Sequence, residues 1–327
     1  MSRPATIDVH AHFLPPVYAE ALRSAGLKTL DGGIPVPEWS PARALAIMDE
    51  LGIRGALLSV SSPHVNFVDR AGAIALCRSV NDYAAEISRR HPDRFGALAI
   101  LPLPDMAASI AELERSLDQL QLEGVALPTH AEGLYLGDAR LAPLLEILDA
   151  RKVTVFVHPT SPRCFAEFGL DLPAPMIEFP FDTTRTAASL LYSGALARHP
   201  GIRFILPHGG GTLPFLAPRM AAVGSIPVLG ARAIPPQQAM QAFARFYYDT
   251  ALSVTPQQMT ALRALAPVSQ IVYGSDFPFA NEDRLRMAEE AFATLPFTAD
   301  EQAQVRLGNA RRLFGGFCER CCGAAQG

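Results

Sequence analysis

Short apolar runs recur along the chain, and each is followed by a stretch whose apolar residues repeat with helical periodicity. Several runs lack a regular alternation of apolar and polar positions, which is typical of parallel strands that are covered on both faces. The runs occupy residues 5–13, 53–60, 94–101, 124–130, 153–159, 202–208, 245–252 and 269–276. Eight strands that alternate with helices predict an α/β protein built as a closed (β/α)₈ TIM barrel, with a doubly wound open sheet as the alternative.

Helix boundaries are marked by residues that suit the two ends of a helix. Between the first two strands, Ser40 can cap a helix, Pro41 suits its first turn and Gly52 can end it. The segment after the third strand follows the same pattern. After the fifth strand, the pattern predicts a helix that begins at DTTRTAASLL, with Asp182 or Thr183 as its cap.

One domain is expected to span residues 1–327, because no internal repeat, low-complexity tract or linker interrupts the pattern. The longest irregular stretches are residues 13–39 and 159–181. Loops of that length in a compact enzyme usually carry function, so we expect both of them near the site.

Composition limits the classes of protein to consider. Nearly half of the 327 residues are apolar, which is enough for a large core, and 18% are charged. The net charge is −4 and no basic patch stands out, which argues against a nucleic-acid partner. The pattern of a signal peptide is missing and no apolar run reaches transmembrane length, so we expect a cytoplasmic protein without a membrane partner.

The cysteines indicate a reducing compartment, because five is an odd number for a disulfide framework in a long chain. Three of them, Cys318, Cys321 and Cys322, lie close to the C-terminus. A structural zinc site needs four ligands, and no nearby histidine or cysteine completes one. We therefore expect a loose C-terminal tail from about residue 316.

Ligand-type side chains lie where the predicted strands end. His10 and His12 close the first strand, and a two-residue period turns both toward the same side. His158, His208 and Asp276 end strands five, six and eight. A single histidine at a strand end is usually a hydrogen-bonded rim residue, but in a barrel these ends meet at one mouth, where catalytic groups lie. The joint pattern predicts a site for one divalent cation, zinc or manganese.

Several sequence words carry a family resemblance across residues 7–315. They are IDVHAHFLPP, MDELGI, VFVHPTSP, LPHGGGTLPF, YYDTAL, YGSDFPF and GNARRLFG. In this order they resemble the amidohydrolase superfamily of metal-dependent hydrolase-type barrels. More narrowly, they are similar to its branch of aminocarboxymuconate semialdehyde decarboxylase and the hydroxybenzoate decarboxylases. The stretch EFPFDTTRTA, residues 178–187, resembles enzymes that decarboxylate 6-methylsalicylate.

The resemblance implies a role for each residue at the mouth of the barrel. It implies that His10, His12, His158 and Asp276 coordinate one metal ion, with water or substrate in the open position. It also implies that His208 is a catalytic residue near the metal rather than an obligate ligand. The family often forms dimers, so a homodimer is expected.

Two departures from related sequences narrow the prediction. Many amidohydrolases hold two metals bridged by a carboxylated lysine at the end of strand four, but the lysines here are Lys28 and Lys152, and strand four ends at His130. This favours a mononuclear site. In the muconate-semialdehyde enzymes, an arginine in the first long loop pairs with a substrate carboxylate, whereas Ile34 stands in its place here, so a dicarboxylic substrate is disfavoured.

The predicted activity is a metal-dependent, non-oxidative decarboxylation of a hydroxybenzoate-type acid such as 6-methylsalicylate, which makes the protein a lyase of aromatic compound metabolism. Asp276 is expected to protonate the ring carbon that bears the carboxylate, with His208 and the metal tuning its pKa. A metal-dependent hydrolase or hydratase acting on an amide, lactone or enol is the alternative. A barrel that keeps the metal only for structure or binding is the non-enzymatic possibility.

The substrate is expected to be a small aromatic carboxylic acid, and three residues are candidates to bind it. Trp39 could cover the pocket or be an interface or core aromatic. Phe179, with Phe181, could flank an aromatic ring. Arg185 could pair with a carboxylate or phenolate, or be a solvated helix residue.

Overall fold

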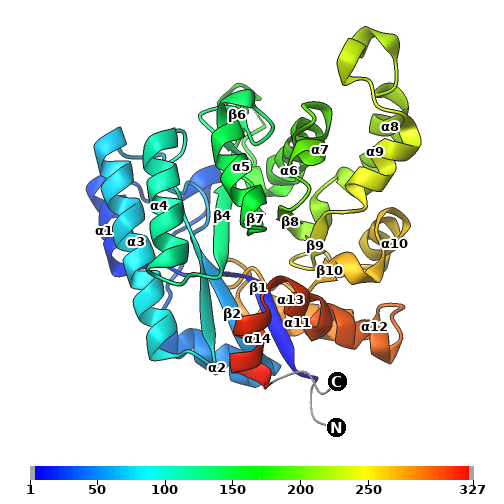
Figure 1. Ribbon diagram of the computed structural model, residues 1–327. Helices are drawn as coiled ribbons and strands as arrows, with labels where there is room; N and C mark the ends of the chain where they lie inside the picture. Colours follow the sequence, from blue (N-terminus) through cyan, green and yellow to red (C-terminus); the bar gives the residue numbers. More distant parts are fainter. Residues whose placement is uncertain (1–3, 169, 324–327) are drawn as a thin grey trace.

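The computed structural model describes residues 4–168 and 170–323, which form a barrel of parallel strands surrounded by helices (Figure 1). Eight strands follow one another around the sheet in the order β1-β2-β3-β4-β7-β8-β9-β10, and all of their pairings are parallel. The strands are β1 (Thr6–His12), β2 (Ile53–Ser59), β3 (Phe95–Ala99), β4 (Gly124–Pro128), β7 (Thr154–His158), β8 (Arg203–Leu206), β9 (Tyr247–Asp249) and β10 (Ile271–Val272). Each lies within one of the predicted runs. A short antiparallel hairpin, β5 (His130–Ala131) with β6 (Leu134–Tyr135), was not predicted.

The segment that follows β10 closes the barrel against β1. The amide of Val9 donates to the carbonyl of Tyr273 at 3.0 Å, and the amide of Asp276 donates to the carbonyl of His10 at 2.8 Å. The closed barrel is therefore confirmed, and the open doubly wound sheet is wrong. Closure also sets the last strand end beside the first, which brings Asp276 next to the two histidines of β1.

The helices begin and end largely at the predicted signals. Ser40 accepts a hydrogen bond from the amide of Arg43 at the start of α2, and Gly52 ends that helix with a φ of 74°. None of the described helices is both long and apolar enough to cross a lipid bilayer. The helices are α1 (Pro16–Ser24), α2 (Pro41–Leu51), α3 (Arg70–Arg90), α4 (Met106–Asp118), α5 (Ala142–Ala150), α6 (Ala174–Tyr192), α7 (Ala195–Arg198), α8 (Leu213–Val223), α9 (Pro236–Phe243), α10 (Pro256–Leu265), α11 (Glu282–Thr294), α12 (Ala299–Ala303), α13 (Asn309–Leu313) and α14 (Gly315–Cys322).

Both long stretches that were expected to be irregular contain helix. Residues 13–39 include α1, and α6 begins at Ala174 rather than at Asp182. The predicted caps are wrong, because Asp182 and Thr183 are buried within α6. Proline is accepted in the first turn of a helix, and Pro180 further along does not end this one, so helix α6 extends into the stretch that was expected to be irregular.

The C-terminal helix α14 corrects the expectation of a loose tail from about residue 316. Phe317, Cys318 and Cys321 are buried in the cluster that fills the barrel interior with Ile7 and Leu57. These three positions share one face of α14. That face covers the apolar end of the barrel, opposite the carboxyl ends of the strands. Burial raises the pKa of both thiols to about 12, which keeps them protonated at neutral pH.

Candidate active site

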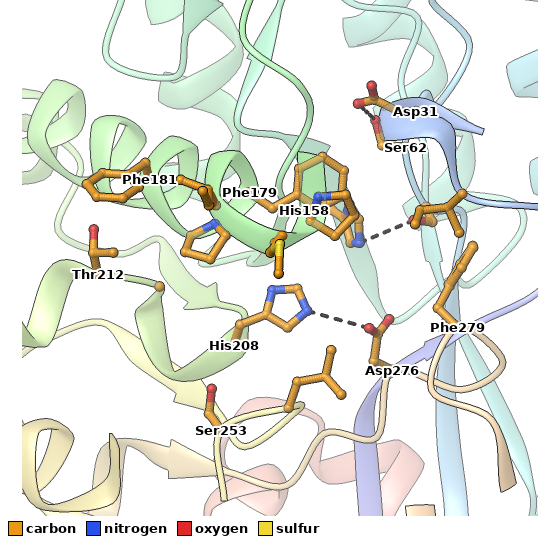
Figure 2. A pocket seen from close by; sticks show the side chains of 18 of the residues that line it. Asp31, Ser62, His158, Phe179, Phe181, His208, Thr212, Ser253, Asp276 and Phe279 are labelled. Carbon is orange, nitrogen blue, oxygen red and sulfur yellow. Dashed lines mark hydrogen bonds and ion pairs between the residues drawn. The ribbon is translucent and has the colours of Figure 1, made fainter. Parts of the chain in front are cut away.

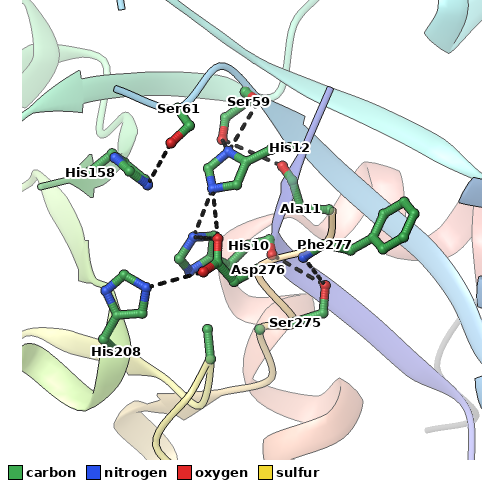
Figure 3. Close-up of polar contacts among 12 residues, drawn as sticks. His10, Ala11, His12, Ser59, Ser61, His158, His208, Ser275, Asp276 and Phe277 are labelled. Atoms are coloured by element: carbon green, nitrogen blue, oxygen red, sulfur yellow. Dashed lines mark hydrogen bonds and ion pairs between the residues drawn. The ribbon is translucent and has the colours of Figure 1, made fainter. Parts of the chain in front are cut away.

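The four residues predicted as metal ligands meet at the mouth of the barrel (Figure 3). One nitrogen or oxygen atom from each of His10, His12, His158 and Asp276 lies within 4.8 Å of all the others, and all four residues are buried. The Nε2 atoms of His10 and His12 are 3.0 Å apart, and Asp276 Oδ1 is 3.2 Å from His12 Nε2. A set of three imidazoles and one carboxylate is a donor set that a catalytic zinc or manganese ion accepts.

The outer nitrogen of each imidazole is held by a protein oxygen. An acceptor at Nδ1 fixes the proton there, so that each Nε2 presents its lone pair to the centre of the cluster. This is the arrangement that a metal ion requires of neutral histidine ligands. The pairs are His10 Nδ1 with Asp249 Oδ2 at 2.7 Å, His12 Nδ1 with the carbonyl of Ser59 at 3.2 Å, and His158 Nδ1 with the carbonyl of Pro159 at 2.8 Å.

Electrostatics at the centre favour a positive charge. Burial opposes a charge on His10, but the carboxylates of Asp249 and Asp276 outweigh it and raise the pKa of His10 to about 10. Burial also opposes ionisation of Asp276, yet hydrogen bonds from His10, His12 and His208 hold its pKa well below the usual range. Burial and the neighbouring histidines lower the pKa of His158 well below its ordinary value. The buried carboxylates of Asp249 and Asp276 thus attract a positive charge to this place, and a divalent cation held by neutral imidazoles would supply that charge in place of the proton on His10.

Asp249 contacts the ligand cluster through His10, and it was not among the residues predicted for the site. It lies at the end of β9 and has no accessible surface. Its Oδ2 binds His10, while its Oδ1 accepts hydrogen bonds from the amides of His208 at 2.8 Å and Ala251 at 3.0 Å. One carboxylate thus orients a ligand and the loop of His208 together. Its position at a strand end, within the word YYDTAL, was the signal that could have found it.

His208 lies beside the ligand cluster without belonging to it. Its Nε2 is 3.6 Å from Asp276 Oδ2, and its side chain is 14% exposed, so it can meet both the cluster and a substrate. The residue has a φ of 55°, at the start of a turn whose glycines also have positive φ. A Cβ at Gly211 would collide with the carbonyl of Pro180, so only glycine lets this turn pack against α6. His208 therefore lies next to the four candidate ligands and outside their group, and its catalytic role stays a prediction.

A cavity of about 520 Å³ opens over the cluster (Figure 2). Its floor contains His158, His208 and Asp276, and much of its wall is apolar, as is common in sites for small organic ligands. The other lining residues are Leu30, Asp31, Ile34, Ser61, Ser62, Pro175, Met176, Ile177, Phe179, Pro180, Phe181, Gly211, Thr212, Leu252, Ser253, Gln258, Phe279 and Arg284.

The structure brings one of the three predicted substrate-binding residues into this cavity. Phe179 lines the wall, and its ring lies 6.2 Å from that of His158. Arg185 lies outside the wall, with its side chain 42% exposed and 3.6 Å from Asp182. It follows Phe179 by six helical positions, a rotation of about 240°, so the two side chains leave α6 on different faces. Trp39 packs against Phe13 at 6.0 Å in the core instead of covering the cavity.

The first long loop reaches the cavity through Asp31, which sequence reasoning also missed. Asp31 Oδ2 accepts hydrogen bonds from Ser62 Oγ at 2.6 Å, Thr160 Oγ1 at 2.8 Å and the amide of Ser161 at 2.7 Å. These bonds tie the loop to the ends of β2 and β7. Arg284, near the start of α11, supplies the one arginine among the described lining residues.

Two further buried histidines, His64 and His130, are absent from the described wall of the cavity. His130 is engaged locally, with Nε2 at 3.2 Å from the carbonyl of Ser161 and Nδ1 accepting from the amide of Gly133. His64 is buried, and neither of its ring nitrogens has a partner in the part of the chain that the structure describes. Burial, with a contribution from His12, lowers the pKa of His64 to about 3.

A closed (β/α)₈ barrel with three imidazoles and one carboxylate at its strand ends is the arrangement of a metal-dependent hydrolase-type enzyme, and these four residues are its candidate metal site. The chain belongs to the amidohydrolase family, whose sequence profile matches residues 7–316. The predicted family and fold are therefore confirmed.

Relatives match along most of the chain. The 6-methylsalicylic acid decarboxylase acuB of Aspergillus aculeatus is 38% identical over 325 residues, which cover 94% of this chain and 95% of the relative. The decarboxylase yanB of Aspergillus niger is 39% identical over 288 residues, covering 84% and 77%. A dihydroxybenzoic acid decarboxylase from Polaromonas, solved with manganese and the inhibitor 2-nitroresorcinol, superimposes with a TM-score of 0.79 at 25% identity and covers 96% and 97%. These relatives agree with the predicted carboxy-lyase class.

Proposed function

We propose that this protein is a divalent-metal-dependent, non-oxidative decarboxylase of a hydroxybenzoate-type acid, with 6-methylsalicylate as the leading candidate. The observation that carries the proposal is the buried ligand cluster of His10, His12, His158 and Asp276 on the floor of a largely apolar cavity. The activities named for the relatives in Aspergillus aculeatus and Polaromonas support the same reaction class.

The cavity suits a flat ring with polar groups at one edge. Phe179, Phe279 and Ile34 provide apolar surface for the ring, while the polar edge faces the ligand cluster. Arg284 contributes a positive charge to the wall, which attracts an anionic acid. A divalent cation held by His10, His12, His158 and Asp276 would supply positive charge that attracts the anionic acid and favours loss of its phenolic proton.

Asp276 then moves one proton from oxygen to carbon. Its carboxylate is ionised, so it first accepts the phenolic proton and next delivers it to the ring carbon that bears the carboxylate. A C–H bond forms at that carbon. The bond to the carboxylate breaks, its electron pair restores the aromatic ring, and CO₂ leaves. The phenolate product takes a proton from solvent, which balances the reaction.

His208 holds the carboxylate of Asp276 in position for this proton transfer. With its Nε2 3.6 Å from Asp276 Oδ2, it can hydrogen-bond the carboxylate in its ionised form. Its amide is fixed by Asp249, which also orients His10, so the imidazole is held at a set place beside the cluster. Positioning of this kind supports proton transfer because the donor and acceptor must lie within hydrogen-bond reach.

The test is a substrate panel of 6-methylsalicylate, salicylate, dihydroxybenzoates and carboxyvanillate, with CO₂ and the aromatic product both measured. Turnover should release CO₂, and in D₂O the product should carry one deuterium at the carbon that lost its carboxylate. Asp276→Asn should abolish turnover even after reconstitution to full metal content, whereas Asp93→Asn, an exposed change of the same charge, should not. Full activity of Asp276→Asn with metal bound contradicts the proton transfer, and hydrolysed or hydrated products support the alternative activity.

The metal and the oligomeric state are tested separately. Zinc and manganese both fit the donor set, so we propose that either restores activity to protein stripped with a chelator. Activity that persists at full rate after complete stripping contradicts the metal requirement.

The homodimer that the resemblance implies stays a prediction, which size-exclusion chromatography with light scattering tests.

A further inference from the structure

A second cavity lies at the other end of the barrel strands. It has a volume of about 430 Å³ and is enclosed by the end of α6, by α7, by the short helical segment Pro227–Arg232 and by α9. Two of its lining residues, Ile202 and Phe246, immediately precede β8 and β9, whereas His208 follows β8 and Asp249 ends β9. The length of these strands therefore separates the cavity from the ligand cluster.

Three arginines line this cavity, and the described lining contains no aspartate or glutamate. Arg198 Nη1 donates to the carbonyl of Ser193 at 2.9 Å, and Arg245 Nη2 donates to the carbonyl of Pro200 at 3.3 Å. Within residues 4–168 and 170–323, neither of them nor Arg232 forms an ion pair with a carboxylate. A guanidinium has five N–H donors, so most of their donor capacity is open.

The other surface of the cavity is apolar and aromatic. The buried rings of Phe204 and Phe246 meet edge to face with centroids 6.2 Å apart, and Ile202 lies beside them. His199 also lines the cavity, and its buried Nε2 has no hydrogen-bond partner among the described residues. Buried polar atoms in folded proteins nearly always have a partner, and a polar ligand here could supply one. The partly exposed side chains of Tyr192, Leu196 and Ile234 line the same cavity, so it combines a cationic rim with an apolar floor.

We propose that this cavity is a second binding site, for a small organic carboxylate with a flat apolar body. Guanidinium groups bind carboxylates through paired, charge-assisted hydrogen bonds, which suits the rim formed by Arg198, Arg232 and Arg245. An aromatic or short hydrocarbon body would cover the partly exposed side chains of Tyr192, Leu196 and Ile234 and gain from burial of apolar surface. A bare inorganic anion would satisfy the rim but leave the floor uncovered.

The test uses 4-fluorobenzoate as the probe, titrated into the full-length protein and followed by fluorine NMR. The wild-type protein should show two classes of binding site for the probe. One is the cavity over the ligand cluster, and the other is the arginine-lined cavity. In the double variant Arg232→Gln/Arg245→Gln the second class should lose at least about tenfold in affinity, because two charge-assisted contacts are removed. Arg89→Gln, an exposed change of the same kind on α3, should leave both classes unchanged.

The outcomes are separable from the decarboxylase proposal, because the readout is occupancy rather than turnover. Thermal unfolding checks that each variant is folded, and Arg232→Gln alone, at an exposed position, serves if the double variant is not. Equal binding of the probe by wild type and the folded variant overturns the proposal. Displacement of the probe from this class by inorganic phosphate at equal concentration also overturns it, because the apolar floor would then contribute nothing.

Discussion

Asp249→Asn tests the contribution of one buried carboxylate that is not itself a candidate metal ligand. Its contact with the candidate ligands is at the outer nitrogen, Nδ1, of His10. Asp249 Oδ2 lies 2.7 Å from His10 Nδ1, and both side chains are inaccessible to solvent. An asparagine keeps the size and can still accept from the amides of His208 and Ala251 through its single oxygen. Its NH₂ group then faces His10 Nδ1, where an acceptor is needed. His10 is driven toward the tautomer with its proton on Nε2, which blocks the lone pair that a metal needs.

The size of the effect follows from that loss of orientation. Removing the hydrogen-bond partner of a ligating histidine typically costs about 10- to 100-fold in metal affinity, or about 1.4–2.7 kcal/mol. We expect the upper part of this range, because the His10–Asp249 contact is short and fully buried, so solvent cannot replace the missing acceptor.

The assay is competition for zinc or manganese against a chelator of known affinity, with bound metal counted by mass spectrometry. Asp93→Asn is the matched control, since it removes one exposed charge and should bind metal as wild type does. Thermal unfolding of the metal-free proteins establishes that Asp249→Asn is folded. A folded Asp249→Asn protein that binds metal within twofold of wild type refutes the assigned role of Asp249.

Three further substitutions test other parts of the structure. His208→Asn should lower kcat by about 10²- to 10⁴-fold while metal content stays at the wild-type level, because His208 lies outside the ligand cluster; loss of metal would contradict this placement. Phe179→Ala should raise KM for an aromatic acid with an unchanged metal content, and an unaltered KM would remove it from the substrate site. Phe317→Ala should lower the free energy of unfolding by about 3–5 kcal/mol in urea titrations, since the ring is fully buried at the end of the barrel. Phe215→Ala, with a residue that is 83% exposed, should change it by less than about 0.5 kcal/mol, and equal losses in both would argue against the packed helix α14.

The segment of residues 159–181 shows what the local sequence pattern could not predict, namely where α6 begins and which of its side chains reach the cavity. Residues 159–181 were expected to be irregular, yet α6 begins at Ala174, with Pro175 in its first turn, where a helix tolerates proline. Once that helix starts earlier, its phase decides which side chains meet the cavity. Phe179 lines the cavity, and Arg185, six positions later, leaves on another face.

The sequence by itself predicted the barrel and the end of the barrel at which the candidate ligands meet. Apolar runs mark the strands, and the carboxyl ends of parallel strands in a barrel meet at one mouth, so the strand-end residues His10, His12, His158, His208 and Asp276 were expected to converge there. The family resemblance, rather than the topology, separated the four implied ligands from His208. Topology alone places such residues together, without knowledge of side-chain packing.

Only the tertiary structure decided what supports that cluster and what surrounds it. Asp249 orients His10 from a strand far along the chain, Asp31 ties the first loop to the cavity, and α14 fills the end of the barrel that a loose tail would have left open. Each of these roles depends on contacts between segments distant in sequence and on the direction in which a side chain leaves its backbone. The local spacing of apolar and polar residues does not encode these contacts or these side-chain directions. It specifies whether a segment is a helix or a strand and which of its faces is buried, but not the segment against which that face packs.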